Sequence, residues 1–507
     1  MSEAKKADVF TEEGRLHTKN PFRFFFDTHA KDGYVPNREL FAYSSALAGQ
    51  NTTYGLVANW MFYFCTNVLH INPLHVGIIT SVSRIWDGVN DPIVGTLIDR
   101  IPAKNGSKLH RYLGKLALVI GVLTVLLFCD PGFSETFLIV WVLGVYILWD
   151  MTYSFQDVAL WGTLSLLSPH SGERTRASQW VSIGASVGAG IVGILPALMD
   201  VSARVGLSER TLFFLCALVF GFGGEAISML ALKTKERIVH PPETEKISFW
   251  QQFAEVRHNK ILVALICAQT LGGLSITVPW IYFFKYCVSY EIGGRTISGE
   301  SVMFLFSIVA GLPGSFCMLI ATKLMQKMGG PKRALMIGQF ATIGIRLLCF
   351  FIGYDTIPKI TAVALLMALS SIPTGIMGIV NRSFLCDSVD YMEWKTGRRT
   401  EGIVSSMQNF VAKISSALQS LINGLVLSGL HFDNTLTGIT GQPEVFYKWQ
   451  WPLFILGPAV GAALYLIPML LLKYTEAERK QVEEALQKKR AKEAETAAAP
   501  TSCKETK

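Results

Sequence analysis

Long apolar segments recur along most of this chain, and their length constrains the fold more than any other feature. The apolar core of a bilayer is ~30 Å thick, so a helix needs about 20 mainly apolar residues to cross it. Twelve segments of the sequence reach that length. Charged residues make up only 17% of the 507 positions, below the roughly 25% typical of soluble domains. The sequence therefore predicts an all-α integral membrane protein with twelve transmembrane helices. The expected spans are residues 41–69, 74–99, 112–130, 135–168, 178–199, 210–232, 259–285, 301–323, 333–353, 358–391, 400–430 and 449–472.

The spans fall into two groups of six, separated by a polar stretch that contains Pro241, Pro242 and several charges. Such a stretch is typical of a linker rather than of a further domain. Near the end of the chain, Glu476 and Lys480 have the i,i+4 spacing that supports a soluble helix, which we expect to extend into solvent. The predicted regions are a cytoplasmic N-terminal segment (1–40), an N-terminal six-helix bundle (41–232), a cytoplasmic linker (233–258), a C-terminal six-helix bundle (259–474) and a cytoplasmic charged tail (475–507).

Basic residues predict the orientation of the chain, because the cytoplasmic loops of membrane proteins are enriched in Lys and Arg. Most of the 46 Lys and Arg residues lie in residues 1–40, in the loops that follow the even-numbered spans, and in the tail. Both termini are therefore expected on the cytoplasmic side of a multi-pass protein in the cell (cytoplasmic) membrane. Residues 1–40 contain no apolar run long enough for a cleavable signal peptide, so the first span is expected to direct insertion.

The sequence lacks the motifs that would indicate an enzyme or an ATP-driven pump. It contains no GxxxxGK(S/T) phosphate loop, no HExxH or GxSxG motif and no paired Cys/His cluster. The nine Cys are scattered without a CxxC pair, as expected of small buried apolar residues. We expect no enzymatic activity, no cofactor and no binding of nucleic acid.

Ionisable side chains within membrane spans are costly, which makes them functional candidates. The second span carries Arg84, Asp87, Asn90 and Asp91 on one helix face, at i,i+3 and i,i+4 spacing. At ~6 Å and an effective dielectric constant of ~20, two carboxylates repel each other by about 3 kcal/mol, so they need a cation or a proton. The additional amide oxygen favours Na+ over H+. The alternative is a structural salt-bridge network, in which Arg84 neutralises part of the charge.

The fourth span has a similar polar face, formed by Asp150, Ser154, Asp157 and Trp161. Carboxylates accept hydrogen bonds from sugar hydroxyls, and an indole ring covers the apolar C–H face of a pyranose. Asp157 and Trp161 are therefore the candidate substrate pair. Taken alone, Trp161 is equally typical of an interfacial anchor.

Polar side chains also occur in the second group of spans. In the eleventh span, Asn409 and Lys413 lie on one polar face, from which Lys413 could pair with an acid of the second or fourth span. Arg346 and Arg382 lie in the ninth and tenth spans, where each is a candidate for substrate binding, gating or structure. Glu225 in the sixth span is isolated, and we assign it no role.

Two motifs resemble a known transporter family. Residues 87–100 read D-G-V-N-D-P-I-V-G-T-L-I-D-R, and residues 387–397 read D-S-V-D-Y-M-E-W-K-T-G. Together with Y-I-L-W at 146–149 and Glu401-Gly402, they resemble the glycoside-pentoside-hexuronide:cation symporters, a melibiose-permease-like family of the major facilitator superfamily. The similarity extends over all twelve spans. It implies the major facilitator fold, with two six-helix bundles around a central cavity and alternating access by rocking of the halves.

Together with the polar faces above, this resemblance assigns candidate residues to three sites. They are a cation site for Na+ or H+, a substrate site and a cytoplasmic gate. The candidates are Asp87, Asn90, Asp91 and Ser154 for the cation; Asn51, Asp157, Trp161, Asn409, Lys413, Arg346 and Arg382 for the substrate; and Asp387, Asp390, Glu393, Arg398 and Arg399 for the gate.

The sequence departs from the family pattern at two positions. The acid that the family has in the first span is Asn51 here, and the arginine that ends its ERTxLxxxR pattern in the fifth span is replaced by Val181. Both departures weaken the case for a galactoside. The presence of Arg346 and Arg382 within spans would suit an anionic glycoside of the hexuronide type.

We interpret the chain as a secondary active transporter that couples import of a sugar or glycoside to Na+ or H+ by alternating access. Two alternatives remain open. One is an Na+-dependent lysolipid carrier of the same superfamily, and the other is a sensor that binds a sugar without transporting it. We expect a monomer in the lipid bilayer that binds a monovalent cation and a small-molecule sugar or glycoside.

Overall fold

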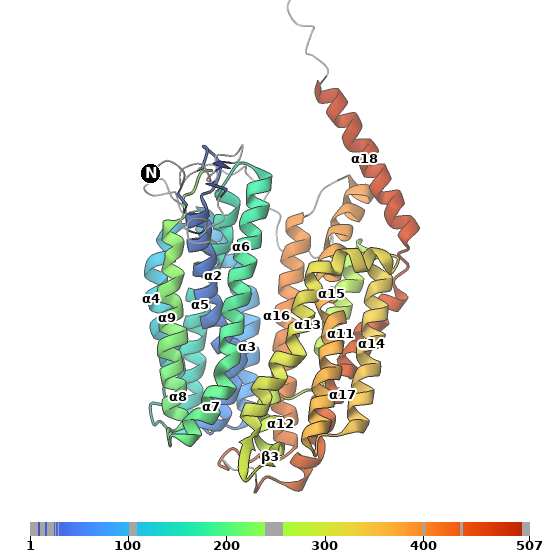
Figure 1. Ribbon diagram of the computed structural model, residues 1–507. Coiled ribbons are helices and arrows are strands. Elements are labelled where there is room, and N and C mark those ends of the chain that lie inside the picture. The colour runs from blue at the N-terminus through green and yellow to red at the C-terminus, as the bar shows by residue number, and fades with distance from the viewer. Residues whose placement is uncertain are drawn as a thin grey trace, which may run out of the picture. The chain divides into compact units, whose positions relative to one another are not determined.

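The computed structural model describes residues 9–10, 16–17, 25, 27–28, 30–100, 109–238, 257–397, 401–436 and 440–498. Nearly all regular structure in these residues is helical (Figure 1). The first half of the sequence forms β1 (Val9–Phe10), β2 (Leu16–His17), α2 (Asn37–Tyr63), η1 (Phe64–Val68), α3 (Pro73–Arg100), α4 (His110–Leu127), α5 (Glu135–Leu166), α6 (Ser171–Ile191), η2 (Val192–Ile194), α7 (Leu195–Arg204), α8 (Glu209–Cys216), η3 (Ala217–Phe222), α9 (Gly223–Ser228) and η4 (Met229–Lys233). The second half forms α11 (Lys260–Gly273), α12 (Trp280–Cys287), β3 (Ser289–Ile292), β4 (Arg295–Ser298), α13 (Gly299–Lys327), α14 (Pro331–Ile352), α15 (Ile357–Thr396), α16 (Glu401–Gly429), α17 (Glu444–Leu471) and α18 (Glu476–Ala498).

Each expected span lies on one helix or on consecutive helical segments. In the described part of the chain, nine helical segments are long and apolar enough to cross a membrane. The other three expected spans lie on α2, on α3 and on the pair α11–α12. Polar side chains lower the hydropathy of α2 and α3, and α11 is only 14 residues long. The all-α membrane fold predicted from the sequence is confirmed.

The seventh span is interrupted, because residues 274–279 separate α11 from α12. Pro279 directly precedes α12 and has no backbone N–H to continue the hydrogen-bonding pattern of α11. A short hairpin of β3 and β4 follows α12. Its turn residues Gly293 and Gly294 have positive φ angles of 57° and 77°, as a two-residue type I′ turn requires. The sequence analysis predicted neither the interruption nor the hairpin.

Helix α2 packs against α6 and α9 through glycines. A Cβ atom at Gly188 would collide with the backbone carbonyl of Ala48, and one at Gly49 would collide with the backbone carbonyl of Gly224. The missing side chains let the helix backbones approach each other directly, as at other small-residue interfaces between membrane helices. This close packing fixes the position of α2, which carries the candidate residue Asn51.

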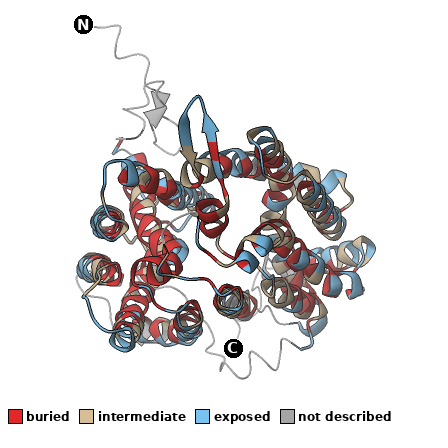
Figure 2. Ribbon diagram, turned by 90° about the horizontal axis from the view of Figure 1, so that it is seen from below, coloured by how far each residue is buried: buried red, intermediate tan, exposed pale blue. Residues whose placement is uncertain are grey.

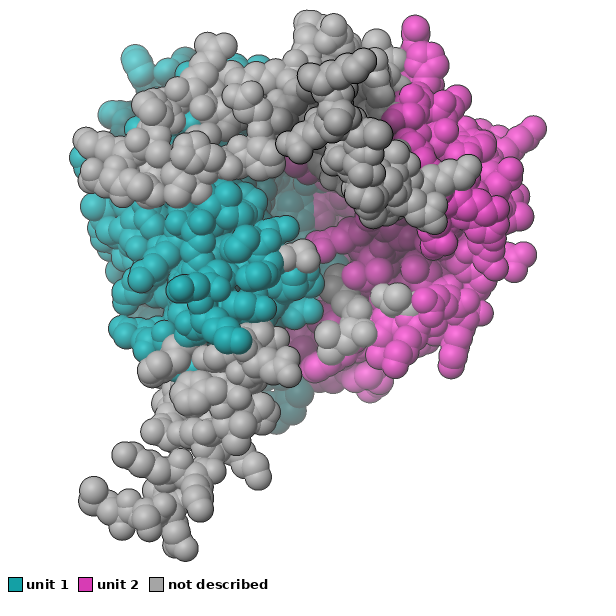
Figure 3. Space-filling view, turned by 90° about the horizontal axis from the view of Figure 1, so that it is seen from above, with its two compact units in different colours: residues 1–244, 279–304, 423–446 teal, residues 245–278, 305–422, 447–507 magenta. Residues whose placement is uncertain are grey.

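The chain divides into two compact units (Figure 3). Within each unit, buried residues lie mainly on the helix faces that turn toward neighbouring helices (Figure 2). Each unit has an apolar core of its own, which includes Leu160 in unit 1 and Phe384 in unit 2. Unit 1 comprises residues 1–244, 279–304 and 423–446, and unit 2 comprises residues 245–278, 305–422 and 447–507.

Unit 1 includes a buried polar cluster contributed partly by the second half of the sequence. Lys285 of α12 is buried and forms an ion pair with Glu209 of α8. Its ammonium group also donates to the Tyr63 hydroxyl over 2.5 Å, and that hydroxyl donates to Glu209 Oε2 over 2.8 Å. The segment 279–304 is thus bound to α2 and α8 by polar contacts as well as by packing.

We expected the tail helix α18 to extend into solvent, but the structure packs it against the core of unit 2. Val482 and Leu486 are only 2% and 3% exposed, and both pack in the apolar core of unit 2. Arg479 forms an ion pair with Asp387, with 3.1 Å between Nε and Oδ2. The tail has few apolar residues, but these two are four positions apart and therefore share one helix face.

Candidate ion and substrate sites

The candidate cation residues lie inside unit 1, on α3 and α5. Asp87, Asn90 and Ser154 are all buried, and the Ser154 hydroxyl donates a 3.4 Å hydrogen bond to Asp87 Oδ1. Asp91 follows one turn after Asp87 and is half-buried. The arrangement places carboxylate, hydroxyl and amide groups in one region, and all three offer the hard oxygen atoms that cations such as Na+ prefer.

Arg84 contacts a tyrosine rather than the acids of this helix face. Its Nη1 atom donates to the Tyr54 hydroxyl over 3.0 Å, and its guanidinium carbon lies 5.6 Å from the centre of the Tyr54 ring. Arg84 also interacts electrostatically with Asp87, so it offsets part of the negative charge of this helix face.

In the candidate substrate pair, the carboxylate of Asp157 is held by α2. Gln50 Nε2 donates to Asp157 Oδ1 over 2.7 Å. The expected first-span residue, Asn51, donates instead to the Leu47 carbonyl over 2.9 Å and to Gln50 Oε1 over 3.3 Å. Trp161 is 42% exposed, so its indole is available to a ligand or to lipid. Gln50 is thus a member of the site that the sequence analysis missed, because it is uncharged and lies outside the polar faces identified there.

Three nearby positions on α5 contact three different helices. Ser154 bonds to Asp87 of α3, and Asp157 bonds to Gln50 of α2. Between them, Gln156 Nε2 donates to Glu225 Oε2 of α9 over 2.6 Å. This segment of α5 therefore connects the candidate cation site with the candidate substrate site inside unit 1.

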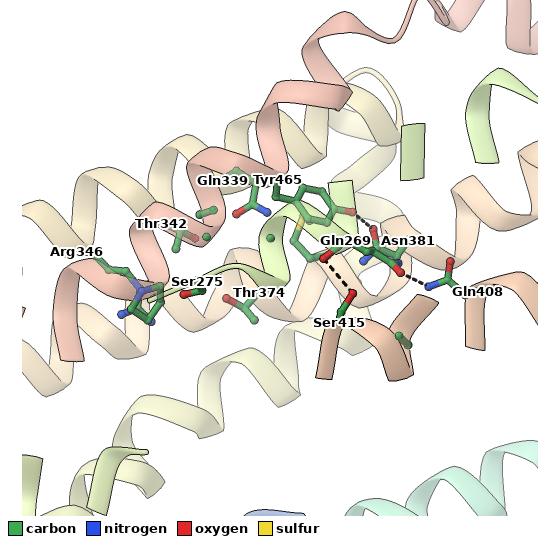
Figure 4. Close-up of a pocket in the computed structure, with 16 residues that line it drawn as sticks. Gln269, Ser275, Gln339, Thr342, Arg346, Thr374, Asn381, Gln408, Ser415 and Tyr465 are labelled. Atoms are coloured by element: carbon green, nitrogen blue, oxygen red, sulfur yellow. Dashed lines mark hydrogen bonds between the residues drawn. The ribbon is translucent and has the colours of Figure 1, made fainter. Parts of the chain in front are cut away.

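Unit 2 contains a polar cavity of about 590 Å³ (Figure 4). Arg346 of α14 lies at one end of the labelled side chains, and a group of hydrogen-bonded side chains lies at the other. In this group, Gln408 donates to Gln269 Oε1 over 2.7 Å, and the Tyr465 hydroxyl donates to Asn381 Oδ1 over 2.8 Å. A cavity lined by amides, hydroxyls and one guanidinium group can bind a hydroxyl-rich molecule that carries a negative charge.

Arg346 has hydrogen-bonding capacity to spare in this cavity. Its Nη1 donates to the Ile455 carbonyl over 3.2 Å, whereas its buried Nε has no hydrogen-bond partner. Within the described chain it forms no ion pair. Of the other second-half candidates, none lines this cavity: Arg382 and Asn409 are exposed, and Lys413 is half-buried.

The candidate gate residues lie on the last turns of α15. Asp387 and Glu393 are buried, and Asp390 is half-buried. Asp387 binds Arg479 of α18, a partner that the sequence analysis did not predict. The remaining gate candidates, Arg398 and Arg399, lie outside the described residues.

Comparison with known proteins identifies the family to which this chain belongs. The family model described as MFS/sugar transport protein matches residues 42–476. The isoprimeverose transporter of Lactiplantibacillus pentosus is 26% identical over 461 residues, covering 90% of this chain and 92% of the relative. An uncharacterized symporter of Bacillus subtilis strain 168 is 26% identical over 459 residues, covering 89% and 95%. The crystal structure of nucleoside transporter NupG has the same fold, with a TM-score of 0.58 and 15% identity over 86% of this chain and all of that one.

The chain therefore belongs to the MFS/sugar transport protein family. It is a multi-pass membrane transport protein and not an enzyme. The resemblance to the glycoside-pentoside-hexuronide:cation symporters inferred from residues 87–100 and 387–397 is confirmed.

Proposed function

We propose that this protein is a symporter that couples the movement of a sugar or glycoside to that of a cation across the cell membrane. The observation that carries the proposal is the arrangement on α5. Ser154 bonds to the candidate cation ligand Asp87, and Asp157, less than one helical turn away, is the candidate sugar ligand. The relatives described above, an isoprimeverose transporter and an uncharacterized symporter, are consistent with this assignment.

Coupling follows from this shared helix by thermodynamic linkage. A cation bound at Asp87 and Asp91 neutralises the acids of α3 and orients Ser154 on α5. Because Asp157 lies on the same helix, this orientation of α5 also positions the Asp157 carboxylate for the sugar. The cation therefore raises the affinity for substrate. The substrate must then raise the affinity for the cation by the same factor. We favour Na+, because the Asn90 amide and the Ser154 hydroxyl add oxygen ligands that a proton does not need.

The direct test is transport by the purified protein in liposomes. A panel of neutral and acidic glycosides is applied with and without an Na+ gradient at fixed pH, and substrate-evoked charge movement is recorded. A Na+-dependent signal supports the proposal. If the signal does not depend on Na+ but disappears when a proton gradient is collapsed, Asp87 and Asp91 bind the coupled proton instead. Binding without counterflow would identify a sensor, and inhibition by detergent-like lipids would favour a lysolipid carrier.

The Asp91→Asn variant tests the cation site. Removing one of the two carboxylates should abolish concentrative uptake, because the site loses the charge that attracts the cation. Asp355→Asn, at an exposed acid paired with Lys359, is the control and should transport normally. If Asp91→Asn still accumulates substrate against a gradient, the cation site lies elsewhere.

An acidic group on the glycoside is the finer proposal for the substrate. It rests on Arg346, whose buried Nε lacks a partner in the polar cavity of unit 2. A hydrogen bond to a charged group contributes about 1.5–3 kcal/mol, so Arg346→Gln should weaken binding of acidic glycosides about tenfold or more. The affinity for matched neutral glycosides should change little. Equal losses for acidic and neutral ligands would contradict a role in anion recognition.

A further inference from the structure

The interior of unit 1 holds a carboxyl group that the proposed transport cycle does not use. Glu225 of α9 is 1% exposed, and its partner Gln156 of α5 is completely buried. Gln156 Nε2 donates to Glu225 Oε2 over 2.6 Å and also to the Ser228 hydroxyl over 2.9 Å. The Ser228 hydroxyl lies 2.9 Å from the same carboxyl oxygen. Glu225 forms no ion pair with any described residue.

The second oxygens of both groups have no hydrogen bond. Glu225 Oε1 and Gln156 Oε1 are buried, and neither has a partner. Both atoms are acceptors if Glu225 is ionised, and each buried acceptor without a donor costs about 1–3 kcal/mol. An ionised carboxylate without a counter-charge costs far more in an apolar interior. A single proton on the carboxyl group removes the charge and supplies the missing donor.

In the described part of the chain, the side chains that hydrogen-bond to Glu225 are neutral: Gln156, Ser228 and Thr53 of α2. Helix α2 also presents Gly49, which contacts Gly224, Ile227 and Ser228. Helix α4 presents Gly121 and Thr124 to the preceding turns of the same span. The titratable groups on this side of α5 are the Tyr153 phenol, which interacts electrostatically with Glu225, and the Asp157 carboxylate, which accepts from Gln50.

A metal ion does not fit the same two oxygens. Hard cations are usually held by about six oxygen ligands, and only Glu225 Oε1 and Gln156 Oε1 are without partners here. A proton needs one donor position and one acceptor, which this pair provides.

We propose that Glu225 and Gln156 form a proton-binding site in unit 1, in which the proton resides on the Glu225 carboxyl group and is shared with the Gln156 amide oxygen. This site is separate from Asp87 and Asp91, and it is connected to the substrate site because Gln156 immediately precedes Asp157. Loss of the proton leaves a buried charge and two buried acceptors without donors, which disfavours the present contact between α5 and α9.

Infrared spectroscopy of the purified protein in lipid tests the protonation state directly. The wild-type protein at pH 7 should show the carbonyl absorption of a protonated carboxylic acid. Glu225→Gln should lose the intensity of one such group, because an amide has no carboxylic acid carbonyl. The variant should still fold, because the amide resembles the protonated acid in shape. Glu135→Gln, at an exposed acid, is the control and should leave the absorption unchanged. The proposal is overturned if Glu225→Gln leaves the band intact, or if the band appears only near the ordinary pKa of Glu, about 4.3.

Thermal unfolding across pH gives a second readout that needs neither substrate nor Na+. The folded state holds a proton that the unfolded chain releases, so raising the pH above about 5 should destabilise the wild-type protein relative to Glu225→Gln. The folding equilibrium constant should fall by up to tenfold per pH unit. Parallel pH profiles for the two proteins contradict the proposal. Either result is independent of whether transport is coupled to Na+, so failure of this site and failure of the proposed function can be told apart.

Discussion

At the scale of single residues, uncharged amides carry much of the polar structure inside unit 1. Gln50 holds Asp157, and Gln156 holds Glu225. A search for ionisable residues in spans finds both acids, because charge in an apolar segment is conspicuous in a sequence. It does not find the amides, since Gln is common on exposed helix faces and nothing in its spacing shows which partner it has.

The Gln50→Ala variant should therefore weaken sugar binding. It removes the donor that fixes Asp157, and the loss of one hydrogen bond to a charged group corresponds to about tenfold in affinity. Asn59→Ala is the matched control, because Asn59 is an exposed amide of the same helix that bonds to the Gly55 carbonyl, and it should change the affinity less than threefold. The measurement is equilibrium binding of the glycoside identified in the liposome panel. Similar losses of affinity in both variants would contradict a specific role of Gln50 in holding Asp157.

At the scale of helices, unit 1 depends on close backbone contacts at glycines. Gly188→Ala should lower the thermal unfolding midpoint by several degrees, because its methyl group would collide with the Ala48 carbonyl and overpacking costs about 1–3 kcal/mol. Gly190→Ala on the same helix has open space around its Cβ position, so it should unfold at the wild-type temperature or slightly above it. A larger decrease for Gly190→Ala would contradict the packing described here.

The tail helix offers a second test at this scale. Leu486→Ala removes a side chain buried in the core of unit 2, and comparable truncations cost about 2–5 kcal/mol. The variant should detach the start of α18 and increase its rate of cleavage by protease at least tenfold. Glu483→Ala changes an exposed position of the same helix and serves as the control. Equal cleavage rates would show that the ion pairs of Arg479 with Asp387 and of Glu478 with Lys260 suffice to hold the tail helix without Leu486.

At the scale of the whole molecule, hydropathy was sufficient to predict the all-α membrane fold and the positions of the spans. The pattern of apolar lengths does so because a bilayer leaves few alternatives to a helix. It could not predict how segments group in space. Residues 279–304 belong to unit 1 although they follow the linker, and the contact between Lys285 and Glu209 joins positions 76 residues apart. Likewise, Arg346 was recognisable as a buried charge, whereas the amide-lined cavity around it depends on five helices.

The cluster of Tyr63, Glu209 and Lys285 has a consequence for biogenesis. The first six spans are synthesised before Lys285. At that stage Glu209 and Tyr63 lack the ammonium group that binds them in the complete protein. The first half of the chain cannot complete its own polar contacts during translation. Its maturation ends only when α12 has been inserted, and a nascent chain halted in the linker should remain a target for membrane quality control.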